Sequence, residues 1–134
     1  MKYIMLSETE TDIMLLLWEA GVPLSRPEIL NRLAGKDWNP NSIHQVLNSM
    51  MKKGVLQVDG MTRCGKIYGR TYKPTMTQQE FVANQIHGIT TNLTPQKRLL
   101  GVVAALSSQD PIDEDTIEAL EDLLNAKQKE IEGK

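Results

Sequence analysis

One face of a predicted helix carries polar groups with almost no charge, and such groups can bond to nucleic acid bases. The segment NPNSIHQVLNSMMKKG, residues 39–54, repeats apolar residues at helical spacing, at Ile43, Val46, Leu47 and Met50. The opposite face carries Asn41, Ser42, His44, Gln45, Asn48, Ser49 and, in the last turn, Lys52. Amides pair with adenine, hydroxyls with several base edges, and imidazole with guanine or phosphate. We therefore expect this face to read bases in the DNA major groove.

Positive charge is concentrated around the same helix. The whole chain has a net charge of -2, but residues 39–74 contain six basic residues and one acid, Asp59. Such an excess attracts phosphate groups. The residues expected to contact the DNA backbone flank this helix or lie in a basic loop, and they are Ser25, Arg26, Lys53, Arg63, Lys66 and Arg70. A solvated surface with a small charge excess is the alternative interpretation.

Several of these residues have other interpretations. His44 either contacts DNA, changes its charge with pH, or is an ordinary exposed histidine. Lys52 and Lys53 suit phosphate contact, and they equally suit the negative end of the helix dipole. Cys64 lies in the basic loop and is either a redox-sensitive thiol or an incidental one.

The residues needed for catalysis, metal binding or membrane insertion do not occur in suitable patterns. The sequence has no Gly-x-Ser-x-Gly elbow, no Gly-rich phosphate loop and no His-Glu motif, so we expect neither an enzyme nor a cofactor. Cys64 is the only cysteine and His87 has no companion at ligand spacing, so we expect no metal site. Without an apolar run of membrane length or a signal peptide, we expect a cytoplasmic protein with no membrane contact.

Local signals place the elements that must position the polar face. Capping boxes predict helix starts at Ser7–Glu10, Ser25–Glu28 and Thr77–Glu80, and Thr94 and Asp113 are further N-caps. Helices are expected over residues 8–20, 26–34, 40–53, 78–88, 95–106 and 114–131, with Asn39 capping the third. Strands are expected over 55–58 and 67–73, joined by the basic loop 59–66. Trp38 is expected to pack into the core.

The order of these elements predicts a mainly α fold with a small β-hairpin. Three helices followed by a hairpin are the layout of a winged helix-turn-helix domain, assigned to residues 1–74. The short connection before the polar helix makes it the recognition helix. Residues 75–134 are expected to form a helical domain. Its amphipathic helices need another surface to cover their apolar faces, either the first domain or a second copy of the chain.

Three segments give the sequence a family resemblance. LSETETDIMLLLWEAG, DWNPNSIHQVLNSMMKKGVL and YGRTYKPTMTQQEF resemble the penicillinase repressor family of transcriptional regulators, most strongly over residues 6–74. The resemblance implies a homodimeric repressor with a C-terminal helical dimerisation domain, bound to an inverted-repeat DNA operator and released by a sensor protease or another inducer. Dimer contacts are then expected from Leu99, Val103, Leu106, Ile117, Leu120 and Leu124.

The sequence departs from the family pattern at three places. His44 and Ser49 stand where penicillinase-type members often carry basic residues, so the base contacts differ. Ala105 and Leu106 replace the Asn-Phe bond at which those members are cleaved, which argues against release by the same cut. The C-terminus lacks the paired Cys-x-Cys motifs of copper-responsive members, which excludes copper sensing by that chemistry. Because the recognition helix has no arginine, a winged-helix protein-interaction module without specific DNA binding is the alternative function.

Overall fold

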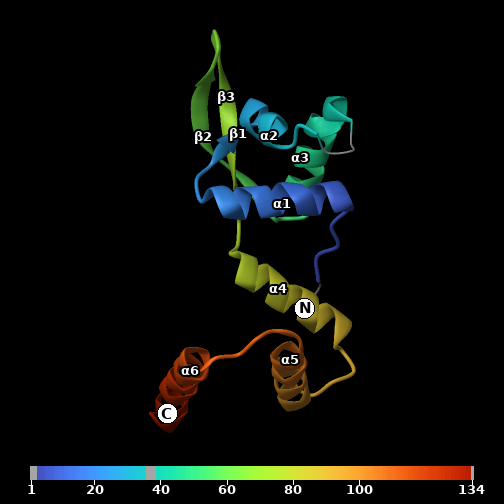
Figure 1. Cartoon of the computed structure of the whole chain (residues 1–134). Coiled ribbons are helices and arrows are strands. Elements are labelled where there is room, and N and C mark those ends of the chain that lie inside the picture. Colours follow the sequence, from blue (N-terminus) through green and yellow to red (C-terminus); the bar gives the residue numbers. More distant parts are fainter. Residues whose placement is uncertain (1–2, 36–38, 134) are drawn as a thin grey trace. The chain divides into compact units, whose positions relative to one another are not determined.

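The computed structural model of the chain describes residues 3–35 and 39–133 (Figure 1). Trp38, which we expected in the core, lies outside the described residues. The chain divides into two units, Met1–Ile89 and Thr90–Lys134, here called the N-terminal unit and the C-terminal unit. The predicted boundary between functional domains, at residues 74 and 75, stays a prediction.

The first two helices begin at the capping boxes that the sequence predicts. α1, Glu8–Ala20, follows Ser7, whose hydroxyl accepts a hydrogen bond from the Glu10 N–H at 3.2 Å. In return, Glu10 Oε1 accepts from the Ser7 N–H at 2.8 Å. α2, Arg26–Arg32, follows Ser25, which forms the same reciprocal pair with Glu28. The predicted helix 8–20 is confirmed, and the predicted helix 26–34 is two residues too long.

The recognition helix begins later than the sequence predicts. Pro40–Ser42 form a 3-10 turn, η1, in which the Asn39 side chain accepts a hydrogen bond from the Asn41 N–H at 3.0 Å. The regular helix, α3, covers Ile43–Lys52. The start predicted at Pro40 is wrong by three residues, because Asn39 caps a tight i to i+3 turn instead of the first α-helical turn.

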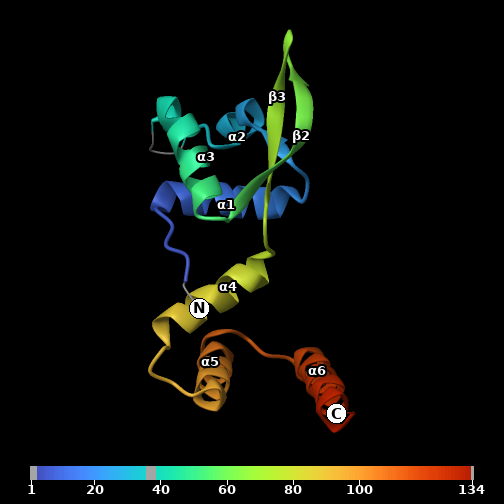
Figure 2. The same ribbon diagram turned by 180° about the vertical axis from the view of Figure 1, so that it is seen from behind.

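A three-stranded antiparallel sheet has the strand order β1–β3–β2. β1, Leu24–Ser25, is too short for sequence periodicity to reveal. β2, Leu56–Cys64, and β3, Ile67–Pro74, are longer than the predicted strands, so the predicted loop 59–66 is wrong. The chain reverses at Gly65, whose φ of 69° suits the first central position of a type II′ turn. The hairpin of β2 and β3, here called the wing, projects beyond the helices (Figures 1 and 2).

The core of the N-terminal unit lies between its first three helices and the sheet. Its buried apolar residues are Ile13, Met14, Leu17, Leu24, Ile29, Leu33, Ile43, Leu47, Met50, Val55, Leu56 and Tyr72. Ile43, Leu47 and Met50 are the apolar stripe predicted for the recognition helix, and Val46 of that stripe is half-buried. Burial of this stripe fixes α3 on the core and leaves its polar face toward solvent. The mainly α, winged helix-turn-helix fold is confirmed.

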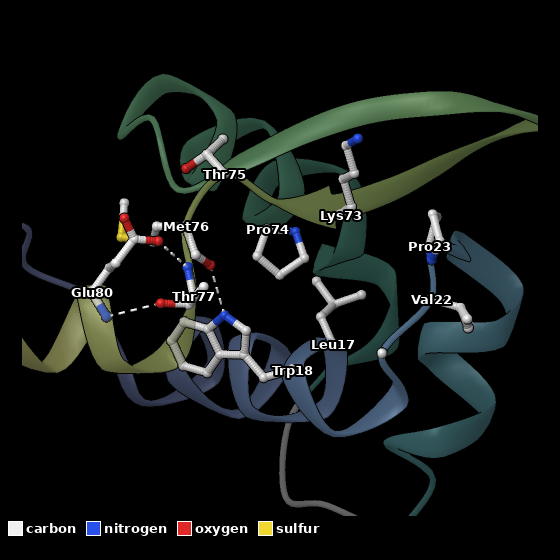
Figure 3. Close-up of a pocket in the computed structure, with 11 residues that line it drawn as sticks. Leu17, Trp18, Val22, Pro23, Lys73, Pro74, Thr75, Met76, Thr77 and Glu80 are labelled. Atoms are coloured by element: carbon white, nitrogen blue, oxygen red, sulfur yellow. Dashed lines mark hydrogen bonds between the residues drawn. The ribbon is translucent and has the colours of Figure 1, made fainter. Parts of the chain in front are cut away.

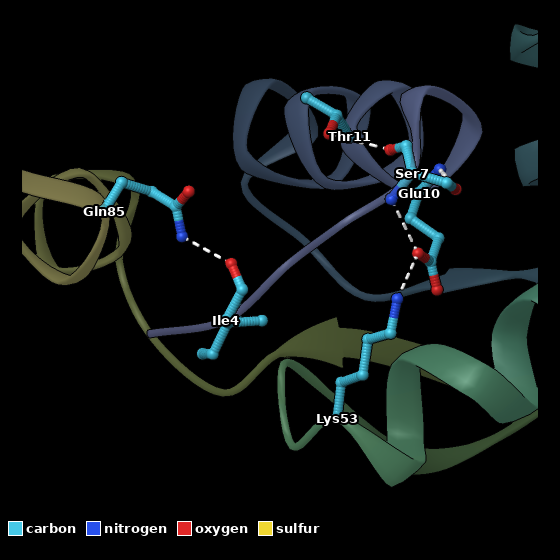
Figure 4. A network of polar contacts seen from close by, with 6 residues as sticks. All are labelled: Ile4, Ser7, Glu10, Thr11, Lys53 and Gln85. Atoms are coloured by element: carbon cyan, nitrogen blue, oxygen red, sulfur yellow. Dashed lines mark hydrogen bonds and ion pairs between the residues drawn. The ribbon is translucent and has the colours of Figure 1, made fainter. Parts of the chain in front are cut away.

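A further helix, α4, Gln78–Ile89, belongs to the N-terminal unit. Trp18 of α1 connects to the segment before it, since the indole N–H donates to the Met76 carbonyl at 3.0 Å (Figure 3). The Trp18 ring centroid lies 5.6 Å from that of Phe81. The Gln85 amide donates to the Ile4 carbonyl, which holds the N-terminal segment on α4 (Figure 4). These contacts join α4 to the winged helix.

The C-terminal unit contains two helices in the described residues. α5, Pro95–Gln109, and α6, Glu114–Glu132, have the predicted N-caps at Thr94 and Asp113. α5 ends three residues beyond the predicted end. Every described residue of α6 is exposed, and α5 has three half-buried residues, Arg98, Val102 and Val103. Across the described residues, no helix combines the length and the apolar character needed to cross a membrane.

Candidate nucleic-acid interface

A row of exposed polar side chains runs along η1 and α3, opposite the core. Counted from Asn41, the others lie at positions i+3, i+4, i+7 and i+11, which places them on one side of the helix. We call this set the α3 stripe, and it consists of Asn41, His44, Gln45, Asn48 and Lys52. It presents amide donors and acceptors, an imidazole and an ammonium group. No acid interrupts it, so it suits a surface that carries both base edges and phosphates.

Three residues predicted to contact DNA lie on another side of this helix. Ser42, Ser49 and Lys53 are separated by seven and four residues, and both serines are half-buried. Lys53 Nζ lies 2.6 Å from Oε1 of Glu10, on α1. Burial raises the pKa of the Glu10 carboxyl, but hydrogen bonds from Lys53 and the Ser7 N–H outweigh burial, and the net pKa is lowered. Lys53 therefore interacts with α1.

The start of α2 contributes one basic side chain to the exposed surface. The Arg26 guanidinium contacts the His44 imidazole, with Nη1 3.0 Å from Nδ1. Ser25, by contrast, is 2% exposed, and its hydroxyl donates to Glu28 Oε1 at 2.8 Å. The backbone N–H and hydroxyl of Ser25 lower the pKa of the Glu28 carboxyl. The Ser25 hydroxyl thus caps α2 and is buried, whereas Arg26 lies beside the α3 stripe.

The wing carries the exposed basic side chains Arg63, Lys66 and Arg70. In the strand register, Arg63 lies opposite Tyr68, and Met61 lies opposite Arg70. Because residues two apart on a strand share a face, Met61, Arg63, Tyr68 and Arg70 form one exposed face with alternating basic and apolar side chains. We missed Met61 because we assigned residue 61 to a loop. Tyr68 lies in the predicted strand 67–73, but without the extended β2 we did not place it opposite Arg63. The spacing of two between Met61 and Arg63, and between Tyr68 and Arg70, was the signal that could have placed these residues on one face.

Two further wing residues are engaged within the hairpin. Asp59 lies at a register shift of β2, and its carboxylate is 3.0 Å from Lys73 Nζ. Cys64 is half-buried, and a Cβ built on Gly69 would lie 2.9 Å from its sulfur. A glycine at position 69 therefore leaves room for the Cys64 side chain across the hairpin. The register shift interrupts the strand alternation at Asp59, and Cys64 alternates with Arg63 along β2, so neither is counted with the face of Arg63 and Arg70. Cys64 does line a hollow between α3 and the wing.

A hollow of about 440 Å³ separates α3 from the wing. It brings together the start of α2, part of the α3 stripe and the exposed face of the wing, through Arg26, His44, Asn48, Met61, Tyr68 and Arg70. These residues come from three stretches of sequence that the fold gathers on one side of the N-terminal unit. The remaining predicted contacts, Asn41, Gln45, Lys52, Arg63 and Lys66, are exposed and lie outside the hollow.

A second hollow, of about 430 Å³, is mainly apolar and lies between the end of α1, the end of β3 and the start of α4 (Figure 3). Leu17, Trp18, Val22 and Pro74 contribute apolar surface to it. It contains none of the predicted site residues. Within the described residues, no three His, Cys, Asp or Glu side chains gather closely enough to hold a metal ion.

Two solved structures align with most of this chain at low sequence identity. A comparison with curated proteins finds no significant match. Among solved structures, the adhesin competence repressor of Streptococcus pyogenes aligns with 96% of this chain and 82% of its own, at 16% identity and a TM-score of 0.45. A variant of Lactococcus lactis ZitR aligns with 95% of this chain and 76% of its own, at 16% identity and a TM-score of 0.43.

The sequence profile described as "Penicillinase repressor" matches residues 6–126, nearly the whole chain. The match includes the winged helix with its α3 stripe and wing, and it continues through α5 into α6. Members of this family are transcriptional regulators and not enzymes. The chain belongs to the penicillinase repressor family, and it is a DNA-binding transcriptional repressor.

Proposed function

We propose that this repressor binds an inverted-repeat operator as a homodimer, with α3 of each copy in the major groove. The observation that carries the proposal is the α3 stripe, which is exposed, polar and free of acids along its whole length. A helix fixed by one apolar face can insert its opposite face between the DNA backbones. The amide, imidazole and ammonium groups of the stripe match the donor and acceptor pattern of major-groove base edges.

Roles within the proposed site follow from position and chemistry. Gln45 and Asn48 face solvent from the middle of the stripe, so we assign them to base contacts, with adenine as the preferred partner of an amide. Phosphate contacts are assigned to the exposed or half-buried basic residues beside them, which are Arg26, Lys52, Arg63, Lys66 and Arg70. Ser25 and Lys53 are removed from the proposed contact set, because their polar groups are engaged within the fold.

Homodimerisation is proposed through the apolar faces of the C-terminal unit. Leu99, Val103 and Leu106 repeat at helical spacing on α5, and Ile117, Leu120 and Leu124 do so on α6. Five of these six side chains are exposed and Val103 is half-buried. Most of the stability of helices in proteins comes from packing of an apolar face, so a second copy of the chain would stabilise α5 and α6 by covering these faces. A two-fold dimer then explains a two-fold operator.

Two parts of the proposal concern the cell. A repressor must reach DNA, so we place the protein in the cytoplasm. We also propose that a sensor protease or another inducer ends repression by acting on the C-terminal unit. The bond between Ala105 and Leu106 lies inside α5 with both residues exposed, so cleavage there requires local unfolding of the helix.

The test is binding of the purified protein to a random pool of labelled duplexes, followed by fluorescence anisotropy on the enriched duplex across a salt series. The expected result is enrichment of an inverted-repeat sequence, with an affinity that falls steeply as the salt concentration rises. Equal binding to all duplexes would remove sequence-specific operator binding and favour the protein-interaction module. The salt slope is the slope of the logarithm of the binding constant against the logarithm of the salt concentration. Substituting Lys52, Arg63 and Lys66 together by Met should reduce the magnitude of this slope by about 0.9 for each phosphate that the variant no longer neutralises.

A further inference from the structure

We propose that Glu10 and Lys53 are positioning residues that hold the C-terminal end of the recognition helix at the angle needed for base reading. The inference rests on the proposed function, because it assigns a role within the same DNA-reading site. Neither residue lies on the α3 stripe. They act on the stripe through α3 itself.

The ion pair joins two helix ends that are far apart in the sequence. Glu10 lies in the first turn of α1, and Lys53 directly follows the last residue of α3. The Glu10 Oε1 atom is 2.6 Å from Lys53 Nζ and 2.8 Å from the Ser7 N–H (Figure 4). A single carboxylate oxygen thus completes the cap of α1 and also holds the end of α3.

The Glu10 carboxylate of this ion pair is almost completely buried, whereas Lys53 is partly exposed. Glu10 is 3% exposed, whereas the Lys53 side chain keeps about a third of its surface exposed. The second oxygen, Glu10 Oε2, is buried and has no hydrogen-bond partner within the described residues. A buried carboxylate in this setting depends on its cation, since burial of an unpaired charge is strongly unfavourable. The contact therefore resists the departure of Lys53 toward a phosphate.

Two fixed points then define the direction of α3. Ile43, at its start, is buried in the core, and the Glu10–Lys53 pair holds its end. Between them, Leu47 and Met50 set the rotation of the helix about its axis. Loss of the pair would leave the end of α3, which carries Lys52, held only by apolar packing. Base contacts depend on angle and distance, whereas attraction to phosphates does not require the same accuracy.

The adjacent lysines give a matched comparison. Lys52 is an exposed member of the stripe, and Lys53 is held by Glu10. Substituting Lys52 by Met should reduce the magnitude of the salt slope by about 0.9 per lysine, or about 1.8 for a dimer. It should leave the affinity ratio between the enriched duplex and a scrambled duplex nearly unchanged. The double variant E10Q/K53M should leave the salt slope unchanged. It should reduce the affinity ratio between the enriched and the scrambled duplex about tenfold, which is the effect expected from weakening one base contact.

The double variant removes both charges, so it leaves no unpaired buried carboxylate, and circular dichroism checks that it is folded. The single variant K53R keeps the cation and should keep the affinity ratio of the wild type. A salt slope reduced in E10Q/K53M as in K52M would show that Lys53 contacts phosphate and would overturn the inference. Full retention of slope and ratio in the folded double variant would also overturn it. If the wild type enriches no sequence, the proposed function is wrong, and this inference, which depends on sequence-specific binding, is wrong as well.

Discussion

The two units of this chain use amphipathic helices in opposite ways. In the N-terminal unit, α1 and α3 bury their apolar sides, and Leu17 and Leu47 are each 1% exposed. In the C-terminal unit, α5 and α6 leave theirs in solvent, and Leu99 and Leu124 are 60% and 55% exposed. The first unit has a complete core and exposes a polar stripe. The second exposes the kind of surface that folded proteins bury.

The α3 stripe and the apolar faces of α5 and α6 therefore suit binding partners of different chemistry. The α3 stripe offers hydrogen bonds and positive charge, which suit DNA. The faces of α5 and α6 offer leucine and isoleucine, which suit another apolar surface, and a second copy of the same chain supplies one of equal shape. Each leucine that such an interface buries completely contributes about 1.5–3 kcal/mol. We therefore propose that the N-terminal unit reads DNA and that the C-terminal unit assembles the dimer.

The largest effect is expected from placing charges on the apolar face of α6. The double variant Leu120→Asp/Leu124→Asp should be monomeric, because two carboxylates on each chain cannot be buried in an apolar interface. A monomer loses the gain from simultaneous contact with two half-sites, so operator affinity should fall by about 10²-fold or more. Sedimentation equilibrium measures the assembly, and anisotropy measures the affinity.

The polar side of the same helix supplies the control. Glu118→Gln/Asp122→Asn changes two exposed residues of α6 on the side away from the leucines, and it should leave the dimer intact. A Leu120→Asp/Leu124→Asp variant that stays dimeric would place the dimer interface elsewhere on the chain.

The next effect compares leucine truncation in the two units. Leu17→Ala should lower the free energy of unfolding by about 2–5 kcal/mol, because it leaves a cavity in the core. This loss should not depend on protein concentration. Leu120→Ala should instead have an effect that depends on concentration, since its burial requires a partner. Thermal unfolding at protein concentrations a hundredfold apart checks both. A concentration-independent loss at Leu120 would contradict the division.

The sequence could predict those features of the fold whose signals are complete within a few neighbouring residues. Helix starts at Ser7, Ser25 and Thr77 were predictable because a capping box is complete within four residues. The apolar stripe of α3 was predictable because periodicity is also local. The late start of α3 was not, because Asn39 and Pro40 favour a 3-10 turn as readily as a helix.

Contacts between distant residues account for what the sequence did not reveal. Lys53 suggested phosphate contact until the fold placed it on Glu10, 43 residues earlier in the chain. Ser25 could be recognised as a cap, but its burial depends on β1 pairing with β3, which no local pattern announces. The hairpin and its basic charge were predicted, but the length of β2 was not, so the position of Tyr68 opposite Arg63 was missed. The sequence showed which polar residues are present, but it did not show which residues they contact in the fold.

A smaller effect is expected within the DNA-reading surface. Asn48→Ala should weaken discrimination at one base pair of each half-site by about 1–3 kcal/mol and leave the salt slope unchanged. The reason is that an amide contributes base contacts and no charge. Asn92→Ala changes an exposed asparagine of the C-terminal unit and is the matched control. Competition anisotropy with single-substitution duplexes measures the discrimination. Equal losses at every duplex would remove Asn48 from the base-reading set.

The smallest effect is expected in the pH dependence that arises from the two capping acids, Glu10 in the N-terminal unit and Asp113 in the C-terminal unit. Both carboxyl groups have lowered pKa values. For Glu10, hydrogen bonds from Lys53 and Ser7 outweigh the opposing effect of burial, and for Asp113 the cause is hydrogen bonding from Thr116. Since the folded state binds the proton less tightly than the unfolded state, each acid adds stability above its ordinary pKa. That stability is lost as pH falls through the lower folded pKa.

The stability difference between wild type and Glu10→Gln should therefore be constant near neutral pH and should shrink as pH falls below the ordinary value of 4.5. Asp113→Asn should show the same sign with a smaller amplitude and a stronger dependence on salt, because Asp113 is exposed and Glu10 is buried. Thermal unfolding by circular dichroism in a pH series, at low and high salt, measures both. If Asp113 had the larger effect, the acid sensitivity of the fold would lie in the C-terminal unit. If the Glu10 difference grew in acid, the carboxylate would be protonated in the folded state and could not hold Lys53.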